Sequence, residues 1–140
     1  MILLDTDHVT LLQHAQGARY ERLAERLNKV VDDVAVPIVA IEEQMRGWMA
    51  VIAKERLTRR QVPPYRELAE LFRFFSRYVI APFDESAAAR FDELRAKKIR
   101  LGTMDLKISA IALVQNALLL SANRRDFERV PALRVENWAD

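Results

Sequence analysis

The sequence predicts an α/β fold in which a parallel sheet of four to five short strands is covered by helices on both faces. Short apolar runs alternate along the chain with longer stretches in which apolar residues recur every three or four positions. This alternation is typical of parallel sheets, whose strands are joined by helices. The chain has 140 residues and is 51% hydrophobic, which favours a single domain over residues 1–140.

In the first half of the chain, two apolar runs predict strands and three periodic stretches predict helices. The run Ile2–Leu4 stops at polar residues, as a buried strand does where it leaves the core. The expected elements are a strand at 2–4, helices at 6–13 and 19–30, a strand at 34–39 and a helix at 41–57. Residues 58–64 contain two prolines and are expected to form a loop between helices.

The second half of the chain continues the same alternation. Asp84 is a favourable N-cap, and Gly102-Thr103 marks the start of another helix. The expected elements are a helix at 65–78, a strand at 79–81, helices at 84–98 and 103–116, a strand at 117–121, a helix at 123–129 and a strand at 133–135. The whole chain therefore holds about seven helices.

Composition excludes several kinds of chemistry. The absence of cysteine removes disulfides, thiolate metal sites and cysteine nucleophiles, and the three glycines are too far apart for a phosphate-binding glycine-rich loop. The formal net charge of +2 permits nucleic-acid binding without requiring it. Carboxylates, hydroxyls, lysines and arginines remain as the groups that can do chemistry.

Nothing near the N-terminus resembles a targeting segment. The first residues carry no positively charged leader, and no stretch approaches the roughly 20 apolar residues of a membrane span. We therefore expect a cytoplasmic protein without membrane association.

Acidic residues follow several of the predicted strands. Asp5 and Asp7 follow the first strand, Glu42 and Glu43 the second, and Asp126 the fourth. Asp105 lies in the first turn of a helix that can face the same edge. Ligands bind at the carboxyl ends of parallel strands, and clustered carboxylates need a proton or a cation. Oxygen ligands of this kind suit Mg²⁺ or Mn²⁺, which predicts metal-dependent phosphodiester hydrolysis.

Each acid also has a structural interpretation. Acidic residues in the first turn of a helix stabilise its dipole, which would explain Asp5, Glu43 or Asp105 taken singly. Asn123 and Asp126 have the spacing of a capping box, and Asp7 can cap the helix that follows it. The functional interpretation depends on the joint arrangement of the acids.

That joint arrangement resembles a known family. The motifs are Leu4-Asp5-Thr6-Asp7-His8, Glu42-Glu43-Gln44-Met45-Arg46-Gly47, Gly102-Thr103-Met104-Asp105 with Ser109–Ala112, and Asn123–Phe127 with Val135–Trp138. In order and spacing they are similar to PIN-domain ribonucleases, and most closely to VapC-type toxins of type II toxin–antitoxin modules. The resemblance spans nearly the whole chain and implies a PIN-like three-layer α/β/α fold.

The resemblance implies a function and a set of site residues. The chain would be a metal-dependent endoribonuclease toxin, with RNA as substrate, a small antitoxin as partner, and a homodimer as its assembly. Asp5, Glu43 and Asp105 match the family's three best-kept acids, which bind Mg²⁺ or Mn²⁺. Glu43 is preferred to Glu42 because the family glutamate lies four residues before a glycine, here Gly47.

The sequence departs from the family pattern around the fourth acid. The alignment places Asn123 at that position, and Asp126, one turn along, is expected to substitute as a catalytic acid. Ala40 replaces a family threonine, Pro37 a small polar residue, and Ser121-Ala122 a Thr-Arg pair. Asp7, Ser121 and Asn123 are expected to support the site, because neighbouring polar groups orient the ligands of a metal.

Basic residues near these acids are candidates for RNA binding. Lys107 lies one turn after Asp105, and Arg124 and Arg125 follow Asn123. If they flank the acidic cleft, they hold phosphates on either side of the scissile bond. The alternative interpretation is a solvated helix face.

Two other functions stay open at this point. One is a catalytically inactive PIN-like module that binds RNA or a protein, which the departures at Ala40, Ala122 and Asn123 would explain. The other is a haloacid-dehalogenase-like phosphatase, in which Asp5 would be the nucleophile and Asp7 the acid. The phosphatase interpretation lacks a later Gly-Asp pair and leaves Glu43 and Asp105 unexplained.

Overall fold

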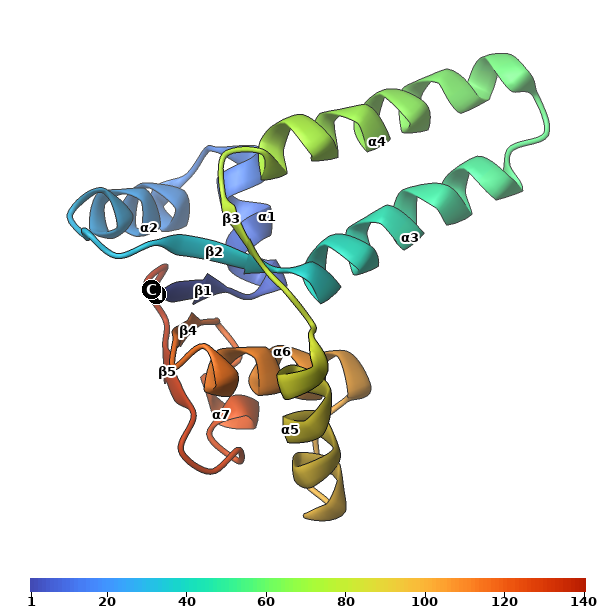
Figure 1. Cartoon of the computed structure of the whole chain (residues 1–140). Helices are drawn as coiled ribbons and strands as arrows, with labels where there is room; N and C mark the ends of the chain where they lie inside the picture. The colour runs from blue at the N-terminus through green and yellow to red at the C-terminus, as the bar shows by residue number, and fades with distance from the viewer.

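The computed structural model describes all 140 residues and confirms the α/β fold, with a five-stranded parallel sheet and seven α-helices (Figure 1). The strands are β1 (Ile2–Leu4), β2 (Val34–Pro37), β3 (Val79–Ala81), β4 (Leu118–Leu120) and β5 (Arg134–Glu136). The α-helices are α1 (Thr6–His14), α2 (Ala18–Asn28), α3 (Ile38–Lys54), α4 (Val62–Phe75), α5 (Glu85–Ala96), α6 (Thr103–Val114) and α7 (Arg124–Phe127). A short 3₁₀ helix, η1 (Thr58–Gln61), precedes α4.

The two faces of the sheet are covered by different helices. Side chains alternate along β1, so that Leu3 belongs to one core and Ile2 and Leu4 to the other. The core around Leu3 contains residues of α5, α6 and α7. The core around Ile2 and Leu4 contains residues of α1, α2 and α4. These two cores make the three layers that the sequence predicts.

The strand order places a crevice beside β1. The sheet runs β3-β2-β1-β4-β5, with every pair parallel. Along the chain, β2 and β3 therefore add to one side of β1, and β4 and β5 then add to its other side. Such a reversal opens a space at the carboxyl ends of the two strands that flank it. Here those strands are β1 and β4, which end at Leu4 and Leu120 and are followed by Asp5 and Ser121.

Two predicted boundaries near prolines differ from the structure. The strand expected at 34–39, with Pro37 at its end, does stop at Pro37, and the helix expected at 41–57 begins at once with Ile38 and ends at Lys54. The expected loop 58–64 is instead η1 followed by the start of α4, with Pro63 and Pro64 in its first turn. The first turn of a helix has no intrahelical acceptor for its N–H groups, so proline is tolerated there.

Helices α3 and α4 form a hairpin that extends away from the sheet (Figure 1). The two helices pack against each other along their length, and residues 55–61 connect them. No helix of the chain, including the 17-residue α3, is both long and apolar enough to cross a bilayer.

Candidate functional site

Asp5 is the buried centre of the acidic site. It follows β1, caps α1, and keeps only 6% of its surface exposed. Its Oδ1 accepts a hydrogen bond from the backbone N–H of Thr6 at 2.8 Å, and its Oδ2 accepts one from the Ser121 hydroxyl at 2.7 Å. Burial outweighs these bonds, and with the nearby charges of Asp7 and Asp105 it raises the pKa of Asp5 to about 6.

Ser121 joins the two strands that flank the crevice. Its hydroxyl lies 2.7 Å from Asp5 and 3.3 Å from Oδ2 of Asp7, so its single proton goes mainly to Asp5. It also accepts a hydrogen bond from the backbone N–H of Asn123 at 3.0 Å. Asp7 holds the same turn, because its Oδ2 accepts from the N–H of Ala122 at 3.0 Å. Ser121 and Asp7 therefore fix the turn after β4 against the turn after β1.

His8 is a buried part of this network, which agrees with the structural role that the sequence favours for it over a contact with substrate. It is fully buried, with Nδ1 2.6 Å from Oδ1 of Asp7. Its Nε2 lies 3.3 Å from the backbone N of Trp138 and accepts a hydrogen bond from that N–H. Because Nε2 accepts, Nδ1 carries the proton and donates to Asp7, so the imidazole is neutral. Both ring nitrogens are occupied, and His8 is therefore a structural link rather than a metal ligand.

The structure distinguishes the two adjacent glutamates. Glu42 forms an ion pair of 2.6 Å with Arg46 on the same helix. Glu43 instead lies beside the first turn of α1, where its Oε2 accepts a hydrogen bond of 3.4 Å from the Thr6 hydroxyl. Its charge also raises the pKa of Asp105. Glu43, and not Glu42, is therefore the glutamate that faces the acidic site.

Asp105 joins the cluster from the first turn of α6. The partly buried carboxylate has its pKa raised, first by burial and then by the charges of Glu43, Asp126 and Asp7. No hydrogen bond is among the causes that shift this pKa, so nothing of that kind compensates the effect of burial and charge. Repulsion between carboxylates from separate elements is the strongest sign that they converge in space.

Asp126 contacts the neighbouring Asn123, but the two do not form the expected capping box. That motif requires each side chain to bond the other residue's backbone N–H. Instead, Nδ2 of Asn123 donates to Oδ2 of Asp126 at 3.0 Å, and the N–H of Asn123 donates to Ser121. Arg129 pairs with the other oxygen of Asp126 at 3.3 Å. Asp126 therefore lies at the rim, near enough to act on Asp105 but partly neutralised by Arg129.

The three candidate RNA-binding side chains differ in their surroundings. Arg125 is exposed and makes no ion pair, whereas Arg124 pairs with Glu128 at 3.2 Å. Lys107 is half-buried, with Nζ 5.7 Å from the centre of the Phe83 ring. Arg125 is thus the most available of the three to a phosphate.

The donor chemistry of the site suits a hard divalent cation. All the candidate ligands are carboxylate oxygens, cysteine is absent, and His8 has no free nitrogen. A cation would also relieve the repulsion that raises the pKa values of Asp5 and Asp105. No three His, Cys, Asp or Glu side chains are arranged to hold an ion jointly, so the exposed Glu43 would have to turn inward.

Comparisons with known proteins match most of the chain. Residues 2–133 match the PIN domain family. Ribonuclease VapC2 of Haemophilus influenzae is 38% identical over 79 residues, which are 54% of this chain, and the match spans only 60% of that relative. The tRNA(fMet)-specific endonuclease VapC of Salmonella typhimurium is 27% identical over 84% of this chain and 85% of its own length. The crystal structure of DNA-bound VapBC from Salmonella typhimurium superposes with a TM-score of 0.77 at 26% identity, over 99% of both chains.

The raised pKa of Asp5 predicts a specific dependence of stability on pH. The folded protein binds the proton of Asp5 more tightly than the unfolded chain does, so this proton adds to the free energy of unfolding at low pH. That added stability is lost as the pH rises from about 4 through about 6. Relative to Asp5→Asn, the wild-type free energy of unfolding should fall by about 3 kcal/mol over this range in EDTA. Urea unfolding at a series of pH values measures it, and parallel curves for the two proteins would contradict it.

The link through His8 predicts a graded set of stabilities. His8→Leu leaves one oxygen of Asp7 and the backbone N–H of Trp138 without partners and should cost roughly 2–5 kcal/mol. His8→Asn retains a donor near the Nδ1 position, and His8→Gln an acceptor near the Nε2 position, so each should cost less. Urea unfolding of the three variants tests this order, and a leucine variant as stable as wild type would refute the link.

Proposed function

The chain belongs to the PIN domain family, and on that basis we propose that it is a metal-dependent endoribonuclease acting as the toxin of a type II toxin–antitoxin module. One observation carries the proposal. Asp5, Glu43 and Asp105 come from three separate parts of the chain. After burial, the charge of Asp105 contributes to the raised pKa of Asp5, and the charge of Glu43 to the raised pKa of Asp105. The names of the relatives, ribonuclease and endonuclease, support the same reaction.

Each residue has a role that its position supports. Asp5 and Asp105, which are buried or partly buried, would hold Mg²⁺ or Mn²⁺, with Glu43 completing the set. A cation held there would polarise the phosphodiester and lower the pKa of an attacking water. Glu43 is the most exposed of the three acids and can accept the proton of that water. The water oxygen forms a bond to phosphorus, and the bond from phosphorus to the leaving sugar oxygen breaks.

The surrounding residues position the acids and the RNA. Ser121 and Asp7 hold the turns that carry Asp5, so their hydrogen bonds keep that carboxylate in place. Arg125 and Lys107, with Arg124 beside them, would hold phosphates next to the bond that is cleaved. Asp126 is positioned to serve as the fourth acid, steadied by the Asn123 amide.

The structure also bears on the alternative functions. In the phosphatase interpretation Asp7 must donate a proton to the substrate, but both of its oxygens are engaged by His8, Ser121 and Ala122. The inactive module is not favoured either, because the three principal acids are present and converge. Neither alternative finds support among the relatives.

Cleavage of a mixed structured RNA by the purified protein tests the activity. Discrete fragments are expected with Mg²⁺ or Mn²⁺ and none with EDTA. Asp5→Asn, Glu43→Gln and Asp105→Asn should each lower the rate by about 100-fold or more, because each removes a ligand or a base. Asp105→Asn should also melt no lower than wild type, because it relieves repulsion.

The opposite results are equally informative. Absence of cleavage in every condition, from a folded protein free of inhibitor, would favour the inactive binding module. Cleavage that survives all three substitutions would indicate a contaminating nuclease. A large drop in the melting temperature of Asp105→Asn would mean that this acid serves the helix rather than the site.

A protein partner is the second part of the proposal. Several structural neighbours are described as VapBC, and one is described as a toxin–antitoxin complex from Klebsiella pneumoniae. An apolar groove of about 340 Å³ lies between α3, α4 and β3, where Phe72 is 60% exposed and Ile38 39%. We propose that an antitoxin segment lies in this groove and passes from Ile41 toward Glu43. A basic side chain of the segment would then enter the acidic cluster and form ion pairs in place of the cation.

Inhibition by the co-expressed antitoxin tests this arrangement. Replacing the inserted basic side chain of the antitoxin should restore cleavage while the complex stays intact, because the apolar groove provides most of the binding. A complex that leaves the carboxylates open and the enzyme active would contradict it. The homodimer implied by the resemblance stays a prediction, and light scattering on the purified protein measures it.

A further inference from the structure

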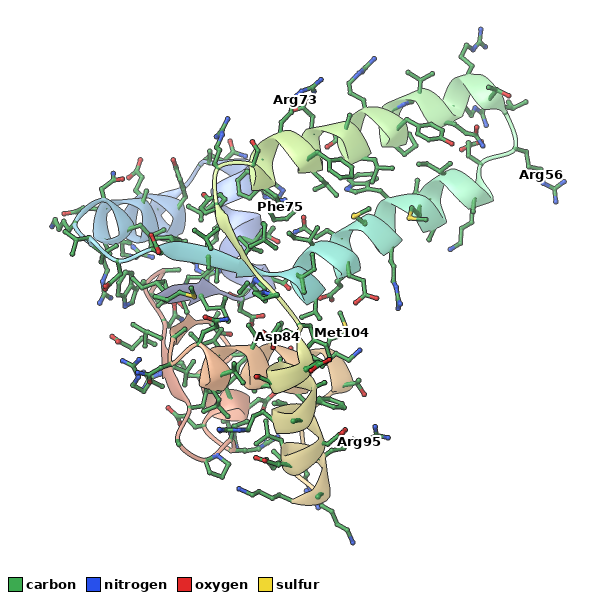
Figure 2. The ribbon with its side chains drawn as sticks, in the orientation of Figure 1. Arg56, Arg73, Phe75, Asp84, Arg95 and Met104 are labelled. Carbon is green, nitrogen blue, oxygen red and sulfur yellow. The ribbon has the colours of Figure 1, made fainter.

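The far end of the α3–α4 hairpin carries an unusual concentration of positive charge. We define the arm tip as residues 54–66, which include the end of α3, the 3₁₀ helix η1 and the start of α4. Figure 2 shows Arg56 at this end, pointing away from the rest of the molecule. The tip holds five of the 22 basic residues and one of the 20 acidic residues. It therefore carries +4, whereas the remainder of the chain carries −2.

The basic side chains of the arm tip are free to bind a ligand. All five are exposed, and none forms an ion pair; they are Lys54, Arg56, Arg59, Arg60 and Arg66. Closer to the sheet, the arginines of the same two helices form ion pairs: Arg46 pairs with Glu42, and Arg73 pairs with Glu70. Within α3 and α4, the basic residues without carboxylate partners are therefore those of the arm tip.

The backbone beneath these charges is fixed. The Nε2 of Gln61 donates to the carbonyl of Ile52 at 3.2 Å and to the carbonyl of Glu55 at 2.9 Å. These bonds close the end of α3 against η1, and two prolines begin α4. A ligand that binds the tip therefore loses little free energy in ordering the chain.

Exposed, unpaired arginines on a rigid convex end favour a polyanion. Phosphate oxygens accept hydrogen bonds from arginine without needing a pocket. None of the five basic residues lines the pocket between α1, α3 and α4 or the apolar groove between α3, α4 and β3. Tyr65, which is 55% exposed, adds an aromatic face on which an unpaired base can stack. An acidic protein segment would also be attracted, but it would gain nothing from such a ring in particular.

We propose that the arm tip binds the phosphate backbone of an RNA at a point away from the cleaved bond. The inference rests on the proposed function, because it supplies a second contact for the same substrate. Lys54 lies eleven residues beyond Glu43 on α3, which is about 16 Å along the helix axis. An RNA that reaches both must span roughly five phosphates of a stacked strand. Short fragments would reach only one of the two.

Binding measured in EDTA separates this proposal from the cleavage reaction. The test variant is Arg56→Gln/Arg59→Gln/Arg60→Gln, and Lys29→Gln/Arg90→Gln/Arg134→Gln is the control with the same loss of charge. The probes are a labelled hairpin RNA long enough to span both sites and an oligonucleotide of about four residues. Fluorescence anisotropy gives Kd at several salt concentrations, and melting curves confirm that both variants fold.

The tip variant should bind the hairpin at least about tenfold more weakly, and the slope of log K against log salt should fall by about 2 to 3. The control should keep the wild-type affinity and slope, and the short oligonucleotide, which reaches only one of the two sites, should bind the wild-type protein more weakly than the hairpin does. Equal losses in the two variants would overturn the proposal, since overall charge would then explain the binding. So would unchanged hairpin binding together with loss of antitoxin binding, which would assign the tip to the protein partner.

Failure of the proposed function would look different. If wild-type protein with Mg²⁺ or Mn²⁺ cleaves neither RNA, the nuclease assignment fails whatever the anisotropy shows. If it cleaves the short oligonucleotide and the tip variant binds the hairpin as wild type does, only the second contact fails.

Discussion

The hydrogen bond from Ser121 to Asp5 connects the two strands on which the site depends. It spans 116 positions of sequence and is buried where β1 and β4 lie side by side. It is also one of the two bonds that oppose the effect of burial on Asp5, whose pKa still rises to about 6. The hydrogen bonds therefore stabilise the ionised carboxylate of Asp5, whereas burial and the neighbouring carboxylates destabilise it. A bound cation would offset both destabilising effects.

The network behind Asp5 extends to the end of the chain. Asp7 receives hydrogen bonds from the turn after β4 and from His8, and His8 in turn receives one from the backbone of Trp138. Trp138 is 7% exposed, and Arg26 of α2 lies over its ring at 4.5 Å. Residues from both ends of the sequence thus fix one carboxylate. This explains how a site built from short turns keeps its geometry, since each turn is tied to an element that is packed into a core.

The sequence predicted the features that depend on the periodicity of apolar residues. It did not predict which polar groups form hydrogen bonds with one another. The strand–helix alternation and the parallel sheet follow from the apolar pattern. The geometry of parallel strands predicts that acids after the strands lie at one edge, whereas the choice of Asp5, Glu43 and Asp105 depends on the resemblance to the PIN family. The capping box at Asn123 was wrong because a better partner, Ser121, took the backbone N–H that the motif needs. The partners of His8 were not identified because one, Asp7, lies next to it and the other, Trp138, lies 130 positions away. No spacing rule connects that pair, although a histidine in a short apolar helix next to an acid was a signal of burial.

The distribution of charge explains why binding and chemistry fall on different parts of the molecule. Without a cation, the acidic cluster repels phosphate, so the attraction that brings RNA to the protein must come from elsewhere. Arg125 and Lys107 provide some of it close to the site, but Arg124 is already paired and the chain outside the arm tip is net negative. The proposed nuclease would therefore gain from a separate basic surface. The hairpin α3–α4 would provide it, because Glu43 lies near the base of the hairpin and unpaired arginines lie at its end.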